Sequence, residues 1–312
     1  MKKKILLAVL AFFTLFLIYA IFVTRVEHKM TRINLPYLKI SEQISSTGNI
    51  AKWYLPFDST DSNAIRFTGN VRIDAPDNGL IITQLTGLRA GYTVTTGKQS
   101  ADIHFDLVPV SKDTTNVTLS FETTLWSKLF SRNSLMRNAE KSLENLRDYF
   151  EDTRKMYGYE IEKSEVTDTA FLFRSAIVGN NLKRVAWKEL FESMIQFAKE
   201  KELGYNGTRI LYFLPFGKDS VHLFASIGIT NTERSRFNEK FLLKQMPYRG
   251  RLLSAYYQGS FGNVGRAINA LEKYRTDNTM TSMAIPFIKL ITEGFDFDDS
   301  KVIQARAFYP VY

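Results

Sequence analysis

The chain has 312 residues, a length typical of two domains of roughly 100–200 residues each. With 45% hydrophobic and 23% charged residues it has the composition of a globular protein, which excludes collagen-like, low-complexity and disordered classes. The absence of cysteine excludes disulfides and thiolate nucleophiles, and with only three histidines we expect no metal and no other cofactor. The net charge is +9, but basic and acidic residues are interleaved along most of the chain, so we expect no nucleic-acid partner.

The first predicted element is a membrane span at residues 5–24. These positions hold no charged side chain, and about 20 apolar residues match the ~30 Å hydrocarbon core of a bilayer. A cleaved signal peptide has a shorter apolar region of roughly 7–15 residues and a small-x-small cleavage site, which this run lacks. The sequence therefore predicts an uncleaved transmembrane helix, a signal anchor, with the lipid bilayer as its partner.

Basic residues on both sides of the span bear on its orientation. Lys2, Lys3 and Lys4 precede it, which favours a cytoplasmic N-terminus. Arg25 and Lys29 follow it and weaken that preference. We expect a single-pass protein of the inner or plasma membrane, with its soluble domains on the outer, periplasmic side.

The region up to residue 156 changes from a strand pattern to a helix pattern. A short strand at residues 34–36 and a helix at residues 38–50 are expected first. Alternating apolar and polar residues between turn signals then predict an antiparallel meander, and later apolar spacings of three and four predict an amphipathic helix from Ser134 to about Met156. The meander strands are expected at residues 64–68, 71–73, 80–85, 91–96, 101–110 and 116–125.

A short aromatic motif stands before this meander. Residues 52–57 read Lys-Trp-Tyr-Leu-Pro-Phe. With the order of anchor, strand, curved sheet and long final helix, residues 25–156 resemble the SRPBCC superfamily, the START-like and polyketide cyclase-like domains of helix-grip fold. The resemblance implies an apolar cavity between helix and sheet, with a lipid-like, polyketide-like or other hydrophobic ligand. A core filled by side chains is the alternative.

From residue 158 one pattern occurs twice: a strand, a glycine-containing turn, an amphipathic helix and two further strands. Neither copy can bury its apolar helix face alone, so we expect the two to pair into one sheet with both helices on one side. The strands are expected at residues 160–178, 208–214 and 221–230 in the first copy, and at residues 251–257, 284–291 and 302–311 in the second.

The second copy carries recognisable motifs. Residues 256–263 read Tyr-Tyr-Gln-Gly-Ser-Phe-Gly-Asn, Pro286 follows, and residues 308–311 read Phe-Tyr-Pro-Val. On these motifs, residues 158–312 resemble the GyrI-like small-molecule-binding domain, the AraC-type effector-binding domain. The resemblance implies a cleft between the repeats for drug-like, often cationic and aromatic ligands. No helix-turn-helix segment precedes this region, so we expect no transcription factor, and the pairing of modules resembles bacterial proteins.

The ligand-binding residues are predicted from this resemblance. The family commonly has a buried Glu two positions after the proline and a Tyr beyond it, where this chain has Ile288 and Leu290. Because a buried carboxylate would attract a cation or serve as a base, cation selectivity and hydrolase chemistry are both in doubt. Aromatic side chains on the neighbouring elements offer contact area with polar tips, although an ordinary core is the alternative for each. The predicted ligand-binding residues are Tyr256, Tyr257, Trp187, Phe171, Phe213, Phe308 and Ile288.

No catalytic residue is predicted. Asp102, His104 and Asp106 alternate on one face of a predicted strand, but a solvated outer face shows the same alternation. Phosphate-cradling glycine loops, a Gly-x-Ser-x-Gly elbow and a His-Glu-x-x-His motif do not occur in the sequence.

The sequence thus predicts an α+β protein with a transmembrane helix, a helix-grip antiparallel sheet domain and a duplicated βαββ domain. The boundaries are expected at residues 1–29, 30–156 and 157–312. The predicted function is membrane-anchored binding of a small hydrophobic, amphipathic or aromatic ligand for sensing, sequestration or transfer, without catalysis. The alternatives are a cyclase-like or hydrolytic enzyme that uses one of the two cavities, and an assembly partner in the cell envelope.

Overall fold

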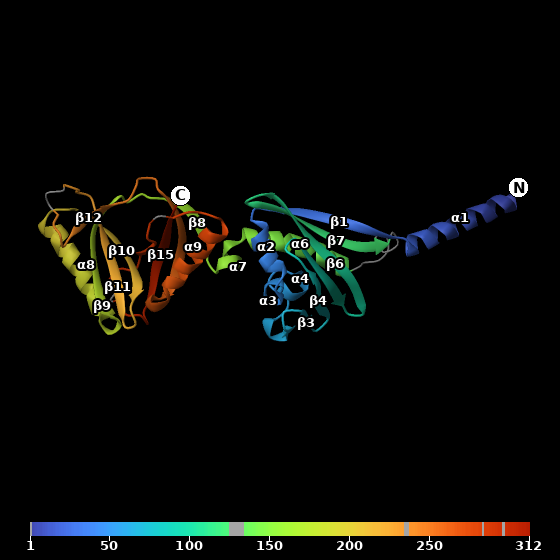
Figure 1. Cartoon of the computed structure of the whole chain (residues 1–312), viewed down its shortest axis with the longest axis horizontal. Coiled ribbons are helices and arrows are strands. Elements are labelled where there is room, and N and C mark those ends of the chain that lie inside the picture. Colours follow the sequence, from blue (N-terminus) through green and yellow to red (C-terminus); the bar gives the residue numbers. More distant parts are fainter. Residues whose placement is uncertain (1, 125–133, 234–236, 283, 295–296) are drawn as a thin grey trace. The chain divides into compact units, whose positions relative to one another are not determined.

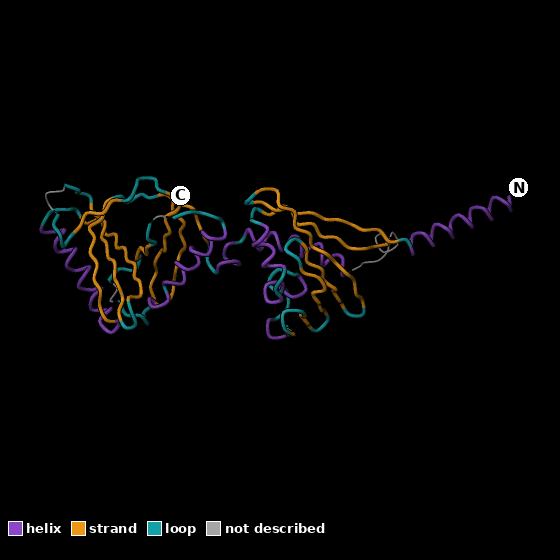
Figure 2. Tube along the Cα trace, in the orientation of Figure 1, coloured by secondary structure: helices purple, strands orange, loops and turns teal. Residues whose placement is uncertain are grey.

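The computed structural model describes residues 2–124, 134–233, 237–282, 284–294 and 297–312, and, within the N-terminal helix, the side chains of residue 10 and of residues from 12 onward. The chain forms two compact units, Met1–Asp152 (unit 1) and Thr153–Tyr312 (unit 2). Each unit has one large antiparallel sheet and packed helices, which confirms the α+β class (Figures 1 and 2). Leu125, the last residue of a predicted strand, lies outside the described residues.

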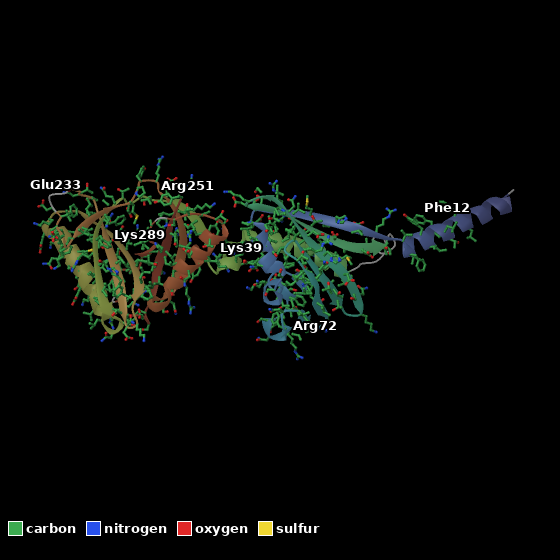
Figure 3. The ribbon with its side chains drawn as sticks, viewed as in Figure 1. Phe12, Lys39, Arg72, Glu233, Arg251 and Lys289 are labelled. Atoms are coloured by element: carbon green, nitrogen blue, oxygen red, sulfur yellow. The ribbon has the colours of Figure 1, made fainter. Side chains whose placement is uncertain are left out.

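Helix α1 spans Lys2–Phe22, close to the predicted membrane span. Its described side chains are largely exposed and apolar, as for Phe12 at 72% and Phe22 at 74% exposure (Figure 3). Within the part of the chain that is described, no helix combines the length and the apolarity needed to cross a bilayer. The transmembrane span therefore stays a prediction.

Unit 1 is built on a seven-stranded sheet in the order β1-β7-β6-β5-β4-β3-β2. The predicted short strand at residues 34–36 is wrong: the first strand is β1, which begins directly after α1 and pairs with the last strand, Thr24 opposite Thr124. The sequence pattern missed β1 because charged residues and exposed apolar residues mask its alternation. The strands are β1 (Thr24–Ile33), β2 (Arg66–Thr68), β3 (Arg72–Ala75), β4 (Asn78–Leu85), β5 (Arg89–Thr96), β6 (Gln99–Ser111) and β7 (Thr114–Thr124).

One long helix, α6, packs on the sheet of unit 1 and contacts β1, β5, β6 and β7. It buries one apolar stripe that includes Leu143 and Leu146, as the spacing predicted. Ser142 on this helix accepts a hydrogen bond from the backbone amide of Leu55, at 2.9 Å, which ties the short helix α4 to α6. The remaining elements are α2 (Tyr37–Ile44), α3 (Thr47–Ile50), α4 (Leu55–Asp58), η1 (Ser62–Ala64) and α6 (Ser134–Glu151).

Aromatic side chains fill the space between α6 and the sheet. Trp53 and Phe105 are fully buried with ring centroids 5.6 Å apart, and Tyr92 lies 5.7 Å from Phe105. The hydroxyl of Tyr92 donates a hydrogen bond to the carbonyl of Ile44. Burial raises the pKa of Tyr54 and Tyr92 above that of a free tyrosine, so both stay neutral. Buried rings thus occupy part of the interior in which the resemblance implied a cavity, and both the cavity and the filled core stay predictions.

Unit 2 holds an eight-stranded sheet in the order β12-β9-β11-β10-β14-β15-β13-β8. Its two halves mirror each other in order, because β9-β11-β10 meets β14-β15-β13 between β10 and β14. The strands are β8 (Ile161–Glu165), β9 (Ala170–Gly179), β10 (Tyr205–Phe216), β11 (Ser220–Ile229), β12 (Leu242–Gln245), β13 (Arg251–Ser260), β14 (Phe287–Leu290) and β15 (Val302–Val311).

The predicted strand at residues 160–178 is two strands in the structure. β8 pairs with β13 near one edge of the sheet, whereas β9 pairs with β11 and β12 near the other. Residues 166–169 cross between the edges, and the segment 246–250 crosses beside them. The amide of Val166 donates to the carbonyl of Gly250 at 2.9 Å, and that of Met246 to Thr169 at 2.9 Å. The predicted strand is much longer than the usual strand of about 5–6 residues. Its length indicates a break within it, but the periodicity did not show where the break lies.

Two helices cover one face of this sheet (Figure 1). α8 packs on β9, β10 and β11, and α9 packs on β13 and β15. Leu211, Leu223, Leu253 and Ala305 of the strands share one buried cluster with Trp187 of α8. The helical elements of unit 2 are α7 (Thr153–Tyr157), η2 (Asn180–Leu182), α8 (Lys183–Glu200), η4 (Phe261–Asn263) and α9 (Gly265–Asp277).

Candidate functional site

The face of the unit 2 sheet opposite α8 and α9 carries a second apolar cluster, which we call the central groove. Successive side chains of a strand point to opposite faces, so the neighbours of helix-facing residues gather on this side. The groove encloses a space of only about 50 Å³. Its apolar lining residues are Val166, Phe171, Ile210, Met246, Leu252, Phe287 and Phe308.

An ion pair lies at the polar side of the central groove. Lys289 on β14 donates to the carboxylate of Asp168 at 2.9 Å, and the hydroxyl of Thr208 lies 3.4 Å from the same oxygen. The side chains of Lys289 and Asp168 remain 37% and 33% exposed. Figure 3 labels Lys289 within the sheet of unit 2. A pair with this much solvent contributes little to stability, about 1 kcal/mol at most, so it is available for rearrangement.

Two buried hydroxyls lie between β8 and β13 on the same face as the groove. Ser254 has no exposed surface and stands opposite Phe308 in the strand register. Neither its hydroxyl nor that of Ser164 has a hydrogen-bond partner among the described residues. Buried polar groups are normally paired. These two hydroxyls are therefore hydrogen-bonding groups that are available to a ligand beside the apolar rings.

The structure separates the predicted ligand-binding residues. Phe171 and Phe308 line the central groove. Trp187 and Tyr257 lie in the main core, on the helix side of the sheet. Phe213 is partly buried beside that core, and the ammonium of Lys183 lies 4.8 Å from its ring centroid. Tyr256 is 44% exposed. Ile288 belongs to the main core.

Ile288 therefore does not stand where the resemblance would place an anionic floor. In β14 the side chains of Phe287 and Lys289 line the groove, and Ile288 between them packs toward the helices. The alternation of side chains along β14 could be predicted from the sequence, but the sequence did not show which face of the sheet the helices cover. Lys289 and Asp168 were missed for this reason, and Asp168 also because it lies in the crossing segment that the sequence suggested was strand.

Two further spaces adjoin the groove. One is a narrow apolar gap of about 80 Å³ beside Met246, Pro247 and Ile285. The other is an open pocket of about 380 Å³ around Arg251, which we call the edge pocket. Leu252 lines all three spaces, so the groove, the gap and the edge pocket meet at the start of β13.

Of the alternating trio of unit 1, Asp102 and His104 line one open space of about 470 Å³ on the outer face of β6, whereas Asp106 does not line it. Asp102 accepts a hydrogen bond from Thr93 at 2.5 Å, and Asp106 pairs with Arg89 at 2.5 Å. The Nδ1 of His104 has no hydrogen-bond partner among the described residues, and no cluster of His, Asp and Glu there has the geometry of a metal site. The trio is the solvated outer face of β6, each carboxylate held by the neighbouring strand.

Comparison with solved structures finds likenesses of low score. The C-terminal domain of EcmrR has a TM-score of 0.37 and 13% identity over 49% of this chain and 98% of that chain. An uncharacterized conserved protein from Listeria innocua has a TM-score of 0.38 and 11% identity over 53% of this chain and 98% of that chain. SAV2435 bound to tetraphenylphosphonium has a TM-score of 0.34 and 12% identity over 49% of this chain and 94% of that chain. No family model and no curated protein matches the chain.

Proposed function

We propose that unit 2 is a GyrI-like module that binds a small amphipathic ligand in the central groove. The observation that carries this proposal is an apolar, ring-lined cluster on the helix-free face of the sheet with the Lys289–Asp168 ion pair at its border. Ligand sites combine such an apolar lining with a few polar groups that fix orientation. The mirrored strand order β9-β11-β10 and β14-β15-β13 supports the module assignment.

Binding requires the groove to open. A space of about 50 Å³ is far below the roughly 300–1,000 Å³ of a usual ligand pocket. Phe287 and Phe308 stack with ring centroids 5.1 Å apart and close it from the sheet side, while Met246 of the crossing segment closes it from the other. Movement of that segment would join the groove to the adjoining gap and expose Ser254 to a polar group of the ligand.

The ion pair cancels two of the three charges that line the groove, and the third, Glu165, is exposed to screening solvent. The wild-type chain should therefore not discriminate strongly between lipophilic cations and anions. We expect Lys289→Met to raise affinity for tetraphenylphosphonium by roughly fivefold, because the unpaired carboxylate of Asp168 then attracts a cation with about 1 kcal/mol. Asp168→Asn should raise affinity for the equally shaped anion tetraphenylborate to a similar extent. Titration calorimetry of the wild-type chain and of both variants with both ions measures these affinities.

Lys188→Met is the matched control, since Lys188 forms a surface pair with Glu192 on α8, at 3.8 Å and 65% exposure. It should leave both affinities within twofold of wild type, while the combined change at residues 168 and 289 should restore the lack of preference. Equal affinities in all variants, or no binding of either ion by any of them, would remove the groove as the binding site.

We further propose that α1 anchors the protein in a membrane as a single-pass helix, with the soluble units on the outer side. Support comes from the twenty uncharged positions at residues 5–24 and from the basic residues before them. The exposed apolar side chains of α1, such as Phe12 and Phe22, would be costly in water. A membrane of this kind would concentrate amphipathic ligands near the binding unit.

Insertion should be abolished by placing a charge pair in the middle of the apolar run. We expect Leu15→Lys combined with Phe16→Glu to release the protein from membranes washed with alkaline carbonate, because each charge at the centre of a span opposes insertion by about 2.5–3.5 kcal/mol. Proteolysis of intact spheroplasts tests the orientation, and digestion of both soluble units is the expected result. Retention of the charged variant in the carbonate pellet would contradict the anchor.

The architecture of unit 1 favours a function other than ligand binding. Its strand order, with β1 beside β7 and α6 across the sheet, supports the SRPBCC-like assignment. Because Trp53, Tyr92 and Phe105 fill the interior, we propose that unit 1 acts as a packed spacer or interaction module and leaves ligand binding to unit 2. This is the envelope-assembly alternative, applied to one unit only.

A further inference from the structure

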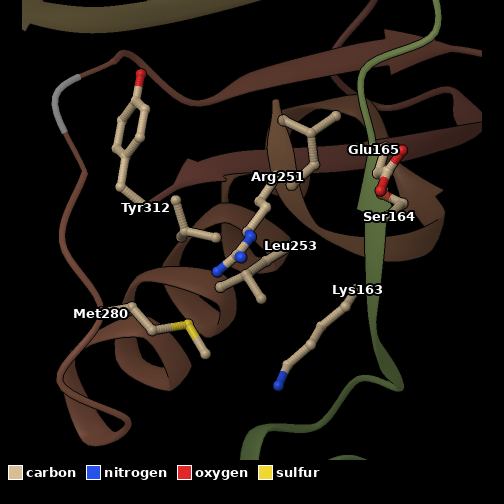
Figure 4. Close-up of a pocket in the computed structure, with 9 residues that line it drawn as sticks. Lys163, Ser164, Glu165, Arg251, Leu253, Met280 and Tyr312 are labelled. Carbon is tan, nitrogen blue, oxygen red and sulfur yellow. The ribbon is translucent and has the colours of Figure 1, made fainter. Parts of the chain in front are cut away.

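The edge pocket is a separate space on the helix-covered side of unit 2, between β8, β13 and the turn after α9. Its volume of about 380 Å³ falls in the range of small-molecule sites, unlike that of the central groove. The walls come from segments far apart in the sequence, which Figure 4 shows around one opening. Its lining residues are Lys163, Ser164, Glu165, Arg251, Leu252, Leu253, Met280, Val311 and Tyr312.

Two cationic side chains share this opening. The guanidinium of Arg251 and the ammonium of Lys163 both point into it, whereas Glu165 lies to one side (Figure 4). Although Glu165 is opposite Arg251 in the strand register, the two form no ion pair at 4 Å or less. Neither cation has a carboxylate partner among the described residues. The pocket therefore holds two cationic side chains against one lining carboxylate, that of Glu165, which leaves a net positive charge.

Apolar side chains form the other wall of the edge pocket. Leu253 is fully buried beneath it, and Met280 packs partly against the main core. The turn that carries Met280 is fixed, because Arg275 donates to the carbonyl of Met280 at 2.8 Å. The amide of Tyr312 donates to the carbonyl of Thr281 at 3.0 Å, which holds the end of β15 against the same turn. These two hydrogen bonds hold the walls of the pocket in place.

We propose that the edge pocket binds a small amphipathic anion, with its carboxylate or phosphate on Arg251 and Lys163 and its apolar chain against Leu253 and Met280. Arginine matches such groups because its planar guanidinium donates two parallel hydrogen bonds to two anion oxygens, and lysine adds a point charge. The methylenes of both side chains cover apolar surface while their charged ends stay hydrated. The edge pocket adjoins the central groove at Leu252, but its two cations do not line the groove, so the site does not depend on the ligand proposed there.

Decanoate below its micellar concentration is the probe for this site. We expect the full chain to bind decanoate and to reject decyltrimethylammonium, which has a chain of the same length and the opposite charge. Arg251→Gln combined with Lys163→Gln should weaken decanoate binding by at least about tenfold, since the charge-assisted hydrogen bonds are lost. Lys188→Gln on α8 removes one surface charge and should leave the affinity within twofold of wild type.

Short-chain dihexanoyl phosphatidylglycerol separates the two sources of such an anion. Tighter binding of decanoate assigns the site to a free carboxylate, whereas tighter binding of the phosphatidylglycerol assigns it to a lipid headgroup. Failure of both to bind, or equal binding by the double variant, would overturn the proposal. Lys163→Gln alone should leave tetraphenylphosphonium titrations within twofold of wild type, because Lys163 lines neither the groove nor the gap, so that failure at the edge pocket and failure at the groove are told apart.

Discussion

Replacing Trp187 with alanine is expected to lower the free energy of unfolding of unit 2 by about 3–5 kcal/mol, the range for removal of a fully buried tryptophan. Trp187 has no exposed surface and stacks with Phe191 and with Phe297, each at a ring-centroid distance of 6.1 Å, and these two rings lie 5.4 Å from each other. Truncation therefore removes both its own transfer free energy and contacts that neighbouring rings cannot recover. The loss falls on unit 2 because these rings belong to its main core.

Amide hydrogen exchange followed by mass spectrometry of peptides measures this loss in each unit of the full chain. Trp187→Phe is the matched control and should show only a fraction of the loss, because the indole Nε1 has no hydrogen-bond partner among the described residues. Peptides of unit 1 should exchange as in wild type. A Trp187→Ala chain that keeps its stability but loses ligand would instead return this residue to the binding site.

Trp53→Ala is expected to destabilise unit 1 to a similar extent, by about 3–5 kcal/mol. Trp53 is fully buried, its ring meets Tyr54 at 6.0 Å and Phe105 at 5.6 Å, and its indole N–H donates to the carbonyl of Gln43 at 3.4 Å. Truncation would remove the contacts of the indole with both rings and leave a cavity where it packs. The same exchange measurement should show faster exchange in unit 1 peptides only.

Phe67→Ala serves as the control for this change, since Phe67 on β2 is 50% exposed and its removal leaves no cavity. Phe67→Ala should change the free energy of unfolding of unit 1 by much less than Trp53→Ala does. A small effect of Trp53→Ala, comparable with that of the control, would show that the interior is open and would restore the hydrophobic-ligand hypothesis for unit 1.

Local sequence patterns located most elements well. The last strand was expected at residues 302–311, and β15 has these bounds; α6 begins at the predicted Ser134. Alternation and helical spacing identify such segments because each depends only on neighbours in the chain. β12 was not predicted, since a strand as short as Leu242–Gln245 is too brief to show a period. Its place beside β9 comes from pairing alone.

Only some residues of the candidate site could be predicted from the sequence in the same way. Phe171 and Phe308 were predicted and do line the central groove, because aromatic residues on the right strands are visible in any sequence. Lys289 and Asp168 were not, since their ion pair joins residues far apart in the chain. The two cations of the edge pocket, Arg251 and Lys163, likewise become neighbours only through pairing of β8 with β13.

By itself the sequence determined the α+β class, the long apolar run near the N-terminus and the pattern that occurs twice in its second half. It also determined which residues of each strand share a face. Only the tertiary structure decided which face the helices cover, so that Ile288 packs in the core while Lys289 lines the groove. The physical reason is that a periodic pattern records the direction of side chains along one element, whereas burial and free volume depend on what other elements place against it.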